Sequence, residues 1–570
     1  MRNLVKASLS LMLLGGSLFA QQAPVQVIPG VKGPVSDTLY NLIMQQATLQ
    51  STQVFRATEM VQKHGPLPEE ASTSRRSAVV AGSAAFAETQ TVVVGPALSA
   101  AAGVNFEGPG AGLGGFAMTG APPDSTMAVG PSHIIAWVNS QFAIFNKNGT
   151  VAAPPANGST IFTGMGGLCE TTNRGDPILQ FDRMAQRWVL SQFAFNVSGS
   201  SPIAPYLQCI AVSTTANPLG TWNRYSFAFS SVAPEGFNDY GKLGVWPDGY
   251  YTAFNIFQGS PAGAFSGAKL CASDRLAMIA GAASPVTVCT PAASYGGGGS
   301  FLPADLDGNT APTTVAQGGL FIRQSTAGQL RLIKMKPDYV TPGNTTYNDG
   351  FGGANGTTFI AIAAPVTRAC NGAGGSCIPQ LGTANLLDTL GDRLMYRAAY
   401  RNRAGVDSLV VNISTDPDGA GARASAIRWF EIRLPFGNPL DINPLLRPTL
   451  YQNATFDQGG VGARWMASIA MDKVGNMLMG YSHSDTNANP SIRITGRNRS
   501  DIRNRMQPEV VMMAGTGSQT GTLTRWGDYS TMQIDPVDDC TFWFITEYLT
   551  ADGTFNWRTR IASYKFGNCI

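Results

Sequence analysis

The chain has 570 residues, of which 13% are charged, and its formal net charge is +3. A charge this close to zero over this length provides no basic stripe of the kind that nucleic-acid binding needs, so neither nucleic acid nor an anionic membrane surface is an expected partner. The 65 glycines and 35 prolines favour turns over long helices, which predicts an all-β fold.

The N-terminus has the layout of a signal peptide. Arg2 and Lys6 precede an apolar run from Leu9 to Phe19, which is followed by Ala20 and two glutamines. The run is shorter than the roughly 20 residues of a membrane span, and no later stretch is long and uncharged enough to form one. We therefore expect residues 1–20 to be a signal peptide, and the mature chain to be secreted without a membrane span.

Eight cysteines follow the expected cleavage site and fall along the chain as four neighbouring couples. An even number of cysteines in an exported chain predicts disulfides. A zinc site is the rival interpretation, but no C-x-x-C motif occurs and the chain has only three histidines. Nearby partners close small loops, so we expect four local pairs, although the sequence alone permits other pairings. The expected pairs are Cys169 with Cys209, Cys271 with Cys289, Cys370 with Cys377, and Cys540 with Cys569.

The composition divides the mature chain into two parts. Residues 21–104 contain a weak helical pattern over 36–62, followed by a linker rich in Ala, Ser, Thr and Pro. Residues 105–570 are expected to form one compact domain that folds without the preceding segment.

A loose unit recurs from residue 105 to the C-terminus. It has a Gly-Asp or Asn-Asp start, an alternating strand, a turn, and then an aromatic-rich strand. Successive starts lie about 50 to 90 residues apart, enough for a four-stranded sheet with its connections, which predicts a β-propeller. We expect seven blades, with six as the alternative because the copies at Asp124 and Asp305 are poor. The clearest starts are Gly175-Asp176, Asn238-Asp239, Gly391-Asp392, Arg464-Trp465 and Gly527-Asp528.

Five stretches spread over residues 105–570 resemble a family of secreted bacterial propeller-like proteins to which no activity is assigned. They are APPDSTMAVGPSH, GDPILQFDRMAQRWVLSQFAF, FNDYGKLGVWPDGYYTAFN, GDRLMYRAAYRN and RWGDYSTMQIDPVDDCTFWFITEY. The segment from Ser213 to Trp222 is also similar to a structural blade turn of the sialidase superfamily, although it is longer and lacks the aspartate of that turn. These resemblances imply secretion and a propeller fold, and they imply no activity.

Four start aspartates are the candidate metal ligands. Because they occupy equivalent places in the repeat, we expect them to converge near one mouth of the central channel. Facing carboxylates repel one another unless a cation, arginines or backbone amides offset them, and Ca²⁺ is the candidate cofactor. The alternative is that each aspartate caps a turn or bonds to the neighbouring blade. These aspartates are Asp176, Asp239, Asp392 and Asp528.

Four arginines beside the starts are candidate ligand-binding residues. Converging guanidinium groups could clamp a carboxylate or sulfate, or they could pair with the start aspartates, which is the arrangement that we favour. These arginines are Arg174, Arg393, Arg464 and Arg525.

Asp528 and Glu547 are the catalytic candidates. Glu547 and Tyr548 are adjacent in a strand and point to opposite faces, so they cannot form the Tyr–Glu couple of a sialidase-type nucleophile. A Glu547 that faces the channel near Asp528 could instead supply a carboxylate pair for work on a glycosidic bond. The Asp-rich segment from Asp305 to Asn309 is expected to be a plain turn, because a calcium loop would need a later carboxylate that is missing.

Two classes of function remain open at this stage. The chain could be a non-catalytic extracellular module that binds glycan or another surface component through one face of the ring, or it could be a glycan-active hydrolase. No G-x-S-x-G elbow or other complete catalytic set is visible, so the sequence favours binding.

Overall fold

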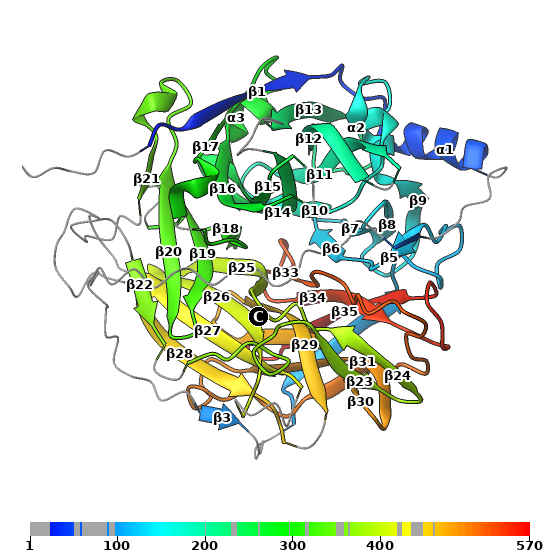
Figure 1. Cartoon of the computed structure of the whole chain (residues 1–570), viewed down its shortest axis with the longest axis vertical. Helices are drawn as coiled ribbons and strands as arrows, with labels where there is room; N and C mark the ends of the chain where they lie inside the picture. The colour runs from blue at the N-terminus through cyan, green and yellow to red at the C-terminus, as the bar shows by residue number, and fades with distance from the viewer. Residues whose placement is uncertain are drawn as a thin grey trace, which may run out of the picture.

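The computed structural model is built mainly of β-strands. Figure 1 shows short sheets that follow one another around a common centre, in colour order from cyan to red. No helix in the described part of the chain is long and apolar enough to cross a membrane. The structure describes residues 23–50, 58–59, 88–90, 97–199, 201–229, 236–259, 263–295, 297–313, 318–348, 358–362, 365–418, 424–434, 448–459 and 462–570.

The strands form antiparallel groups of four, most of them from one continuous stretch of chain. The first three groups are β6 (Ser125–Val129), β7 (His133–Val138), β8 (Gln141–Asn146) and β9 (Val151–Asn157); β10 (Ile178–Asp182), β11 (Arg187–Ser198), β12 (Ser201–Ser213) and β13 (Trp222–Phe229); and β14 (Phe237–Trp246), β15 (Gly249–Phe257), β16 (Phe265–Ser273) and β17 (Val286–Cys289). The next three are β18 (Leu302–Asp307), β19 (Gly319–Thr326), β20 (Gln329–Lys336) and β21 (Thr346–Asn348), with β22 (Thr358–Ala361) also on β20; β25 (Leu394–Arg403), β26 (Val406–Thr415), β27 (Ala426–Leu434) and β28 (Thr449–Phe456); and β29 (Ala463–Met471), β30 (Met477–Asp485), β31 (Ala488–Arg497) and β32 (Val510–Met513).

The last group is completed by a strand from the other end of the chain. Its β33 (Thr531–Ile534), β34 (Phe542–Tyr548) and β35 (Arg558–Phe566) are consecutive, and β35 then pairs with β4 (Ala100–Glu107). The expected domain start at residue 105 therefore falls inside the closing strand.

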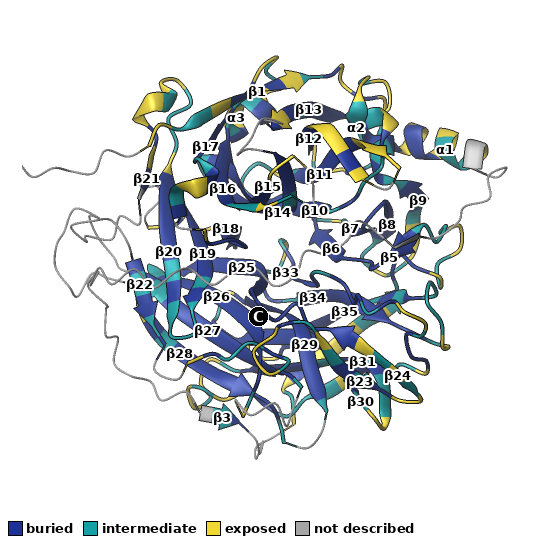
Figure 2. Ribbon diagram, viewed as in Figure 1, coloured by how far each residue is buried: buried dark blue, intermediate teal, exposed yellow. Residues whose placement is uncertain are grey.

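The first strand of every group faces the common centre, and these strands form a closed ring. Contacts run from β6 through β10, β14, β18, β25 and β29 to β33, and from β33 back to β6. The first strands are buried along their length, whereas exposed residues gather on peripheral turns, on α1 and on β12 (Figure 2). The architecture is therefore propeller-like.

A residue with positive φ lies within four residues of the start of every first strand, inside the strand in β14 and β29 and before it in the others. Such a conformation is uncommon outside glycine and is best tolerated by Asp and Asn. The recurrent start motif of the sequence therefore coincides with a local departure from regular strand backbone. The residues and their φ values are Asp124 47°, Asp176 46°, Tyr240 54°, Ser300 55°, Leu390 45°, Met466 52° and Gly527 41°.

The N-terminal segment packs on the ring at several places. β1 (Gln26–Lys32) pairs with both β13 and β17 and so joins two neighbouring groups. Helix α1 (Leu39–Gln50) lies within the range in which a helix was expected, and it buries Leu39 and Ile43. β3 (Glu88–Gln90) pairs with β28. The expected signal peptide, residues 1–20, lies outside the described residues.

The remaining described elements are short and lie between the groups. They are β2 (Thr58–Glu59), β5 (Gly120–Ala121), β23 (Ser376–Gln380), β24 (Thr383–Asp388), α2 (Leu168–Thr171), α3 (Arg275–Ile279) and the 3₁₀ turns Gly158–Phe162, Ala292–Tyr295 and Pro342–Asn344.

The expected plain turn at Asp305 to Asn309 is wrong, because most of it is the end of strand β18. Asp305 and Asp307 are two residues apart and so share one face of β18. Both accept hydrogen bonds from the fully buried Arg397, at 2.9 and 2.6 Å. This ion pairing inside the ring explains why the Asp-rich segment is extended. The local sequence could not predict it, because Arg397 lies far away in the chain.

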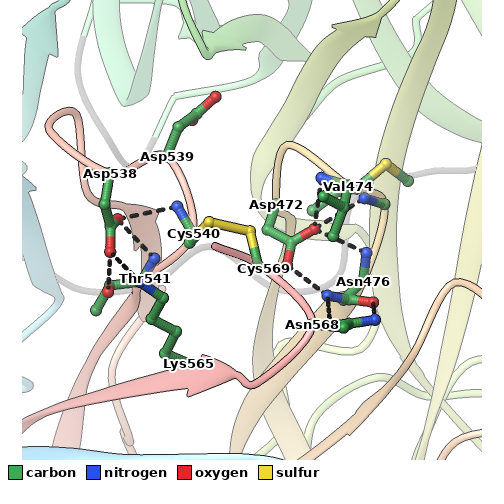
Figure 3. Close-up of a disulfide and its surroundings, with 12 residues drawn as sticks. Asp472, Val474, Asn476, Asp538, Asp539, Cys540, Thr541, Lys565, Asn568 and Cys569 are labelled. Carbon is green, nitrogen blue, oxygen red and sulfur yellow. Dashed lines mark hydrogen bonds and ion pairs between the residues drawn. A yellow bond between two sulfur atoms is a disulfide. The ribbon is translucent and has the colours of Figure 1, made fainter.

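All four expected disulfides are present, and no described cysteine is free. The bond between Cys540 and Cys569 ties the C-terminus to the start of β34. Figure 3 shows it between two aspartate-centred turns. In one of them, Asp472 accepts backbone hydrogen bonds from Val474, Gly475 and Asn476, and Gly475 supplies the φ of 100° that the turn requires.

Removal of the terminal disulfide should destabilise the closing group. For the 29-residue separation of Cys540 and Cys569, the chain-entropy relation gives a loss of about 3 to 4 kcal/mol in the free energy of unfolding. The Cys540→Ala/Cys569→Ala variant can be compared with the wild type by urea denaturation without reductant. The matched control is Cys370→Ala/Cys377→Ala, whose loop spans 7 residues and should cost about 2 kcal/mol. An equal or larger loss in the control would contradict the closing role.

Candidate functional site

Five carboxyl groups gather where first strands begin, at what we call the start mouth of the ring. Asp124 and Asp176 stand just before β6 and β10, Asp239 lies near the start of β14, Asp528 precedes β33, and Glu547 comes from β34. The Asp528 backbone N–H donates to Asp124 Oδ1 at 2.6 Å. Glu547 Oε1 lies close to Gly527, only 2.9 Å from where a Cβ would stand. We call these five side chains the mouth carboxylates.

The mouth carboxylates differ in burial. Asp124 and Glu547 are buried, each with 2% of its surface exposed. Asp176, Asp239 and Asp528 are half-buried, so solvent reaches these three residues more readily than the other two.

Three cations stand among or beside these acids. Lys242 is 1% exposed, and its Nζ lies 3.3 Å from the ring centroid of Tyr240 and 4.3 Å from that of Tyr529. Arg525 Nη2 donates to Asp528 at 2.6 Å. Arg393 is the third cation, and its guanidinium lies 4.5 Å from the ring centroid of Tyr240.

Burial and mutual repulsion raise the pKa values of four of these carboxyls, those of Asp124, Asp176, Asp239 and Glu547. Burial, reinforced by the charge of Asp239, raises the pKa of Asp176 to about 7. Burial and then Asp528 raise the pKa of Asp239 to about 6. Burial and the neighbouring acids raise the pKa values of Asp124 and Glu547 well above their usual range. Carboxyl groups whose pKa values are raised to about 6 or 7 can take up and release protons at physiological pH.

Burial also lowers the pKa of Lys242 to about 8, against the opposing charge of Asp176. Because the neighbouring acids favour its charged form, Lys242 carries a positive charge inside the cluster below that pH. Its position beneath Tyr240 and Tyr529 keeps water away from the amine and fixes where its charge acts.

Three buried polar atoms of this region have no hydrogen-bond partner within the described part of the chain. They are Glu547 Oε2, Tyr240 OH and Arg525 Nη1. Unpartnered buried polar groups cost free energy unless a ligand or a water molecule satisfies them.

The structure brings together three of the four start aspartates. Asp176, Asp239 and Asp528 converge at the start mouth, and Glu547 faces the same cluster. Tyr548 points away and donates to Glu107, so the expectation that Glu547 and Tyr548 face apart is confirmed. Asp392 lies at the border of the cluster, where both of its carboxylate oxygens accept hydrogen bonds from Arg393, at 2.7 and 2.9 Å.

The four candidate arginines separate into two kinds. Arg393 and Arg525 pair with start aspartates, which confirms the pairing that the sequence favoured for these two. Arg174 lies over the ring of Phe195, and Arg464 makes a two-pronged ion pair with Glu509. The four arginines therefore do not form a single clamp.

Sequence reasoning missed Asp124, Lys242 and Tyr240 as site residues. Asp124 was taken for a degraded copy of the start motif, although it precedes β6 as Asp176 precedes β10. A lone lysine in the otherwise apolar run of β14 was the signal that could have found Lys242, since a buried lysine needs acidic neighbours.

The proposed calcium site stays a prediction of the sequence. No group of three or more His, Cys, Asp or Glu side chains that could hold a metal ion occurs within the described ranges. Within the described residues, cationic side chains and retained protons offset the charge of the mouth carboxylates.

The other end of the ring has a different electrostatic character. Arg183, Arg397 and Arg401 pair there with three aspartates, among them Asp539, which Arg401 contacts at 2.6 and 2.8 Å. These ion pairs fill the interior near the ends of the first strands, whereas the start mouth gathers several acids around Lys242 and Arg525.

No protein-family model and no curated protein matches the sequence. The chain is similar in part to a protein of unknown function from Dyadobacter fermentans, at 11% identity and a TM-score of 0.27, over 83% of this chain and 97% of that chain. It is similar to the α-L-arabinofuranosidase Arb93A from Fusarium graminearum in complex with an iminosugar inhibitor, at 9% identity and a TM-score of 0.33, over 83% of this chain and 99% of that chain. It is also similar to a mutant of the NanB sialidase from Streptococcus pneumoniae, at 9% identity and a TM-score of 0.31, over 77% of this chain and 67% of that chain. These identities and scores are too low to support an inference about function, so the site must be interpreted from its own geometry.

The Asp176→Asn variant should be more stable than the wild type at high pH. A carboxyl whose folded pKa is about 7 and whose unfolded pKa is about 4 makes the wild type lose stability as pH rises from about 4 to about 7. Asparagine removes that charge and tolerates the positive φ, so the variant should gain on the order of 1 kcal/mol at pH 8 and little at pH 4.

Urea denaturation at both pH values measures this difference. Asp338→Asn is the control, because Asp338 is an exposed turn carboxyl whose pKa is lowered by backbone hydrogen bonds, and the variant should show no gain at pH 8. Destabilisation of Asp176→Asn at pH 8 would show that the Asp176 carboxylate is well paired in the fold.

Proposed function

We propose that the chain is a secreted, seven-bladed β-propeller that hydrolyses glycosidic bonds at its start mouth. The blade count rests on the closed ring of first strands with one four-stranded group behind each. Export rests on the signal-like N-terminus and on four disulfides, which persist in oxidising compartments.

The raised pKa values of two half-buried carboxyls, Asp176 and Asp239, support hydrolysis best. Glycosidic cleavage needs one carboxylic acid that keeps its proton and a second carboxyl that is ionised at the same pH. The pKa values of about 7 and about 6 satisfy this requirement between those two pH values.

The two carboxyls have separate roles in this proposal. Asp176 donates its proton to the glycosidic oxygen as the bond to the anomeric carbon breaks. Asp239 takes a proton from the water whose oxygen forms the new bond to that carbon, and solvent exchange then returns each group to its starting state. Lys242 acts as a positioning residue, because its charge stabilises ionised neighbours and limits how far their pKa values rise.

Binding without hydrolysis is the second candidate, and a cavity beside the cluster favours it. The cavity is polar, and it is lined by Ser300, Arg323, Gln324, Asp392 and Arg393, with Gly299 and Leu394. The cavity has room for about one water molecule, so its hydroxyl, amide and guanidinium groups would contact a sugar that lies over its opening. No mouth carboxylate lines it.

Hydrolysis can be tested with the purified chain on a panel of natural glycans and by product analysis. We expect release of reducing ends, with kcat/KM following a bell-shaped pH dependence whose maximum lies between about 6 and about 7. Asp176→Asn and Asp239→Asn should each lower kcat by at least about 100-fold, whereas Asp338→Asn should leave it unchanged.

Full activity in both mouth variants would exclude the proposed pair. Binding to a glycan of the panel without any product, in wild type and variants alike, would replace hydrolysis by the second candidate.

A further inference from the structure

We propose that the disulfide between Cys370 and Cys377 is a reducible latch on the start mouth, which a dithiol opens while the other three disulfides stay closed. Opening of the latch frees the turn that precedes β25 and leads into Asp392 and Arg393. The expected change in this turn does not depend on the activity of the chain, whereas the expected loss of glycan cleavage rests on the proposed function.

Among the described disulfides, this bond is the one that solvent reaches. Cys370 and Cys377 are both half-buried, whereas the six other cysteines are at most 1% exposed. Residues 371–373 and Ser376, which lie between the two cysteines, are exposed. A thiolate must reach a sulfur atom to cleave a disulfide, so an accessible bond exchanges more readily than a buried one.

The same bond closes the shortest loop of the four. Its cysteines are 7 residues apart, whereas the cysteines of the other pairs are 18, 29 and 40 residues apart. A short loop restricts the unfolded chain least, so its cleavage should destabilise the fold least. Cys377 lies in β23, which pairs with β24 outside the four-stranded groups. The ring can therefore stay folded while this bond is open.

The disulfide holds the loop in an unfavourable backbone conformation. Four of its residues have positive φ, namely Cys370 at 59°, Asn371 at 52°, Gly372 at 83° and Gly374 at 67°. Such values cost free energy in residues other than glycine, and two of the four are not glycine. We therefore expect the loop to relax to a different conformation once the bond is open.

Two carbonyl groups of the loop support the turn before β25. The backbone N–H of Thr389 donates to the carbonyl of Gly375 at 3.0 Å, and the N–H of Gly391 donates to the carbonyl of Gly374 at 3.2 Å. The Thr389 hydroxyl donates to Gly375 as well, at 3.1 Å. These bonds lie on both sides of Leu390, whose φ is 45°. Relaxation of the loop would therefore remove the partners that hold this turn.

The turn leads directly to the polar cavity and to the mouth carboxylates. Asp392 and Arg393 line the cavity, and a Cβ on Gly374 would stand only 3.1 Å from the backbone nitrogen of Asp392. The Arg393 guanidinium lies 4.5 Å from the ring centroid of Tyr240, and its charge partly offsets the rise that burial causes in the pKa of Asp239. A shift of the turn would move this guanidinium and change the surroundings of Asp239.

Opening of the latch is a two-electron thiol–disulfide exchange. A thiolate of the dithiol attacks one cysteine sulfur, the S–S bond breaks, and the other cysteine leaves as a thiolate. The second thiol of the reductant then attacks the mixed disulfide, so the reductant leaves as a disulfide and its two protons pass to the two cysteines. The dithiol is oxidised and the protein is reduced by two electrons. The reverse exchange, with oxidised dithiol in excess, closes the latch.

Differential alkylation of the intact folded chain tests which bond opens. The chain is incubated with dithiothreitol and alkylated with iodoacetamide, then unfolded, fully reduced and labelled with heavy iodoacetamide for peptide mass spectrometry. We expect Cys370 and Cys377 to be alkylated at least about tenfold faster than any other cysteine. Earlier alkylation of another pair, or simultaneous alkylation of all eight cysteines, would overturn the latch.

Hydrogen exchange tests what the latch holds. In the reduced chain, the amides of Thr389 and Gly391 should exchange at least about tenfold faster than in the oxidised chain, because their acceptors lie in the loop. The turn centred on Asp472, next to a buried disulfide, is the internal control and should keep its protection. Equal protection of the two amides in both redox states would overturn the proposal and leave the disulfide as a staple of a surface loop.

The Cys370→Ser/Cys377→Ser variant should reproduce the reduced state without reductant. It should show the faster exchange of Thr389 and Gly391, and dithiothreitol should not increase that exchange further. Normal protection of these amides in the folded variant would contradict the latch. If the variant does not fold, the reduced wild type decides the question.

Activity separates the latch from the proposed hydrolysis. Reduction of a chain that cleaves glycan should lower kcat/KM at least about fivefold, and reoxidation should restore it. Cleavage with the same kcat/KM in both redox states would overturn the latch and leave the catalytic pair intact. Faster exchange of the turn on reduction, in a chain that cleaves no glycan, would support the latch and overturn the hydrolysis.

Discussion

The pairing of β35 with β4 completes the last four-stranded group from the two ends of the chain, and the arrangement of the start mouth depends on this closure. A sheet assembly that closes on itself leaves no free edge at the joint and fixes the relative direction of its inner strands. The turns at which those inner strands begin therefore all lie at one end of the ring. Closure therefore places aspartates that are hundreds of residues apart in sequence, such as Asp124 and Asp528, within hydrogen-bond distance.

The two ends of the ring interior use charge in opposite ways. At the far end, three arginines and three aspartates form one network of ion pairs, and Arg397 is fully buried between Asp305 and Asp307. At the start mouth, the acids outnumber the cations, and the excess is carried as retained protons. Buried acids of this kind lower the stability of the fold. Such a loss is tolerated at sites where proton transfer or a charged ligand compensates for the excess of acids.

Local sequence was sufficient where the determinants were local. The start motif located Asp176, Asp239 and Asp528, and short cysteine spacings predicted all four disulfides. It was insufficient where pairing is non-local. The sequence around strand β4 resembles an alanine-rich linker, because the role of β4 depends on its pairing with β35. Paired residues of these strands, such as Phe106 and Ile561, are more than 450 residues apart in the sequence. Asp392 shares the start motif, yet its neighbour Arg393 occupies both of its oxygens, which the motif could not reveal.

The central claim is that Asp176 and Asp239 hold protons near neutral pH. Carbon-13 NMR of the chain labelled at aspartate carboxyl carbons, recorded from pH 3 to 9, measures this directly, and Asp176→Asn and Asp239→Asn assign the two resonances. The account predicts that these two signals titrate near pH 7 and pH 6, above the range of ordinary aspartates. Titration of both signals near pH 4, together with those of exposed aspartates, would contradict it.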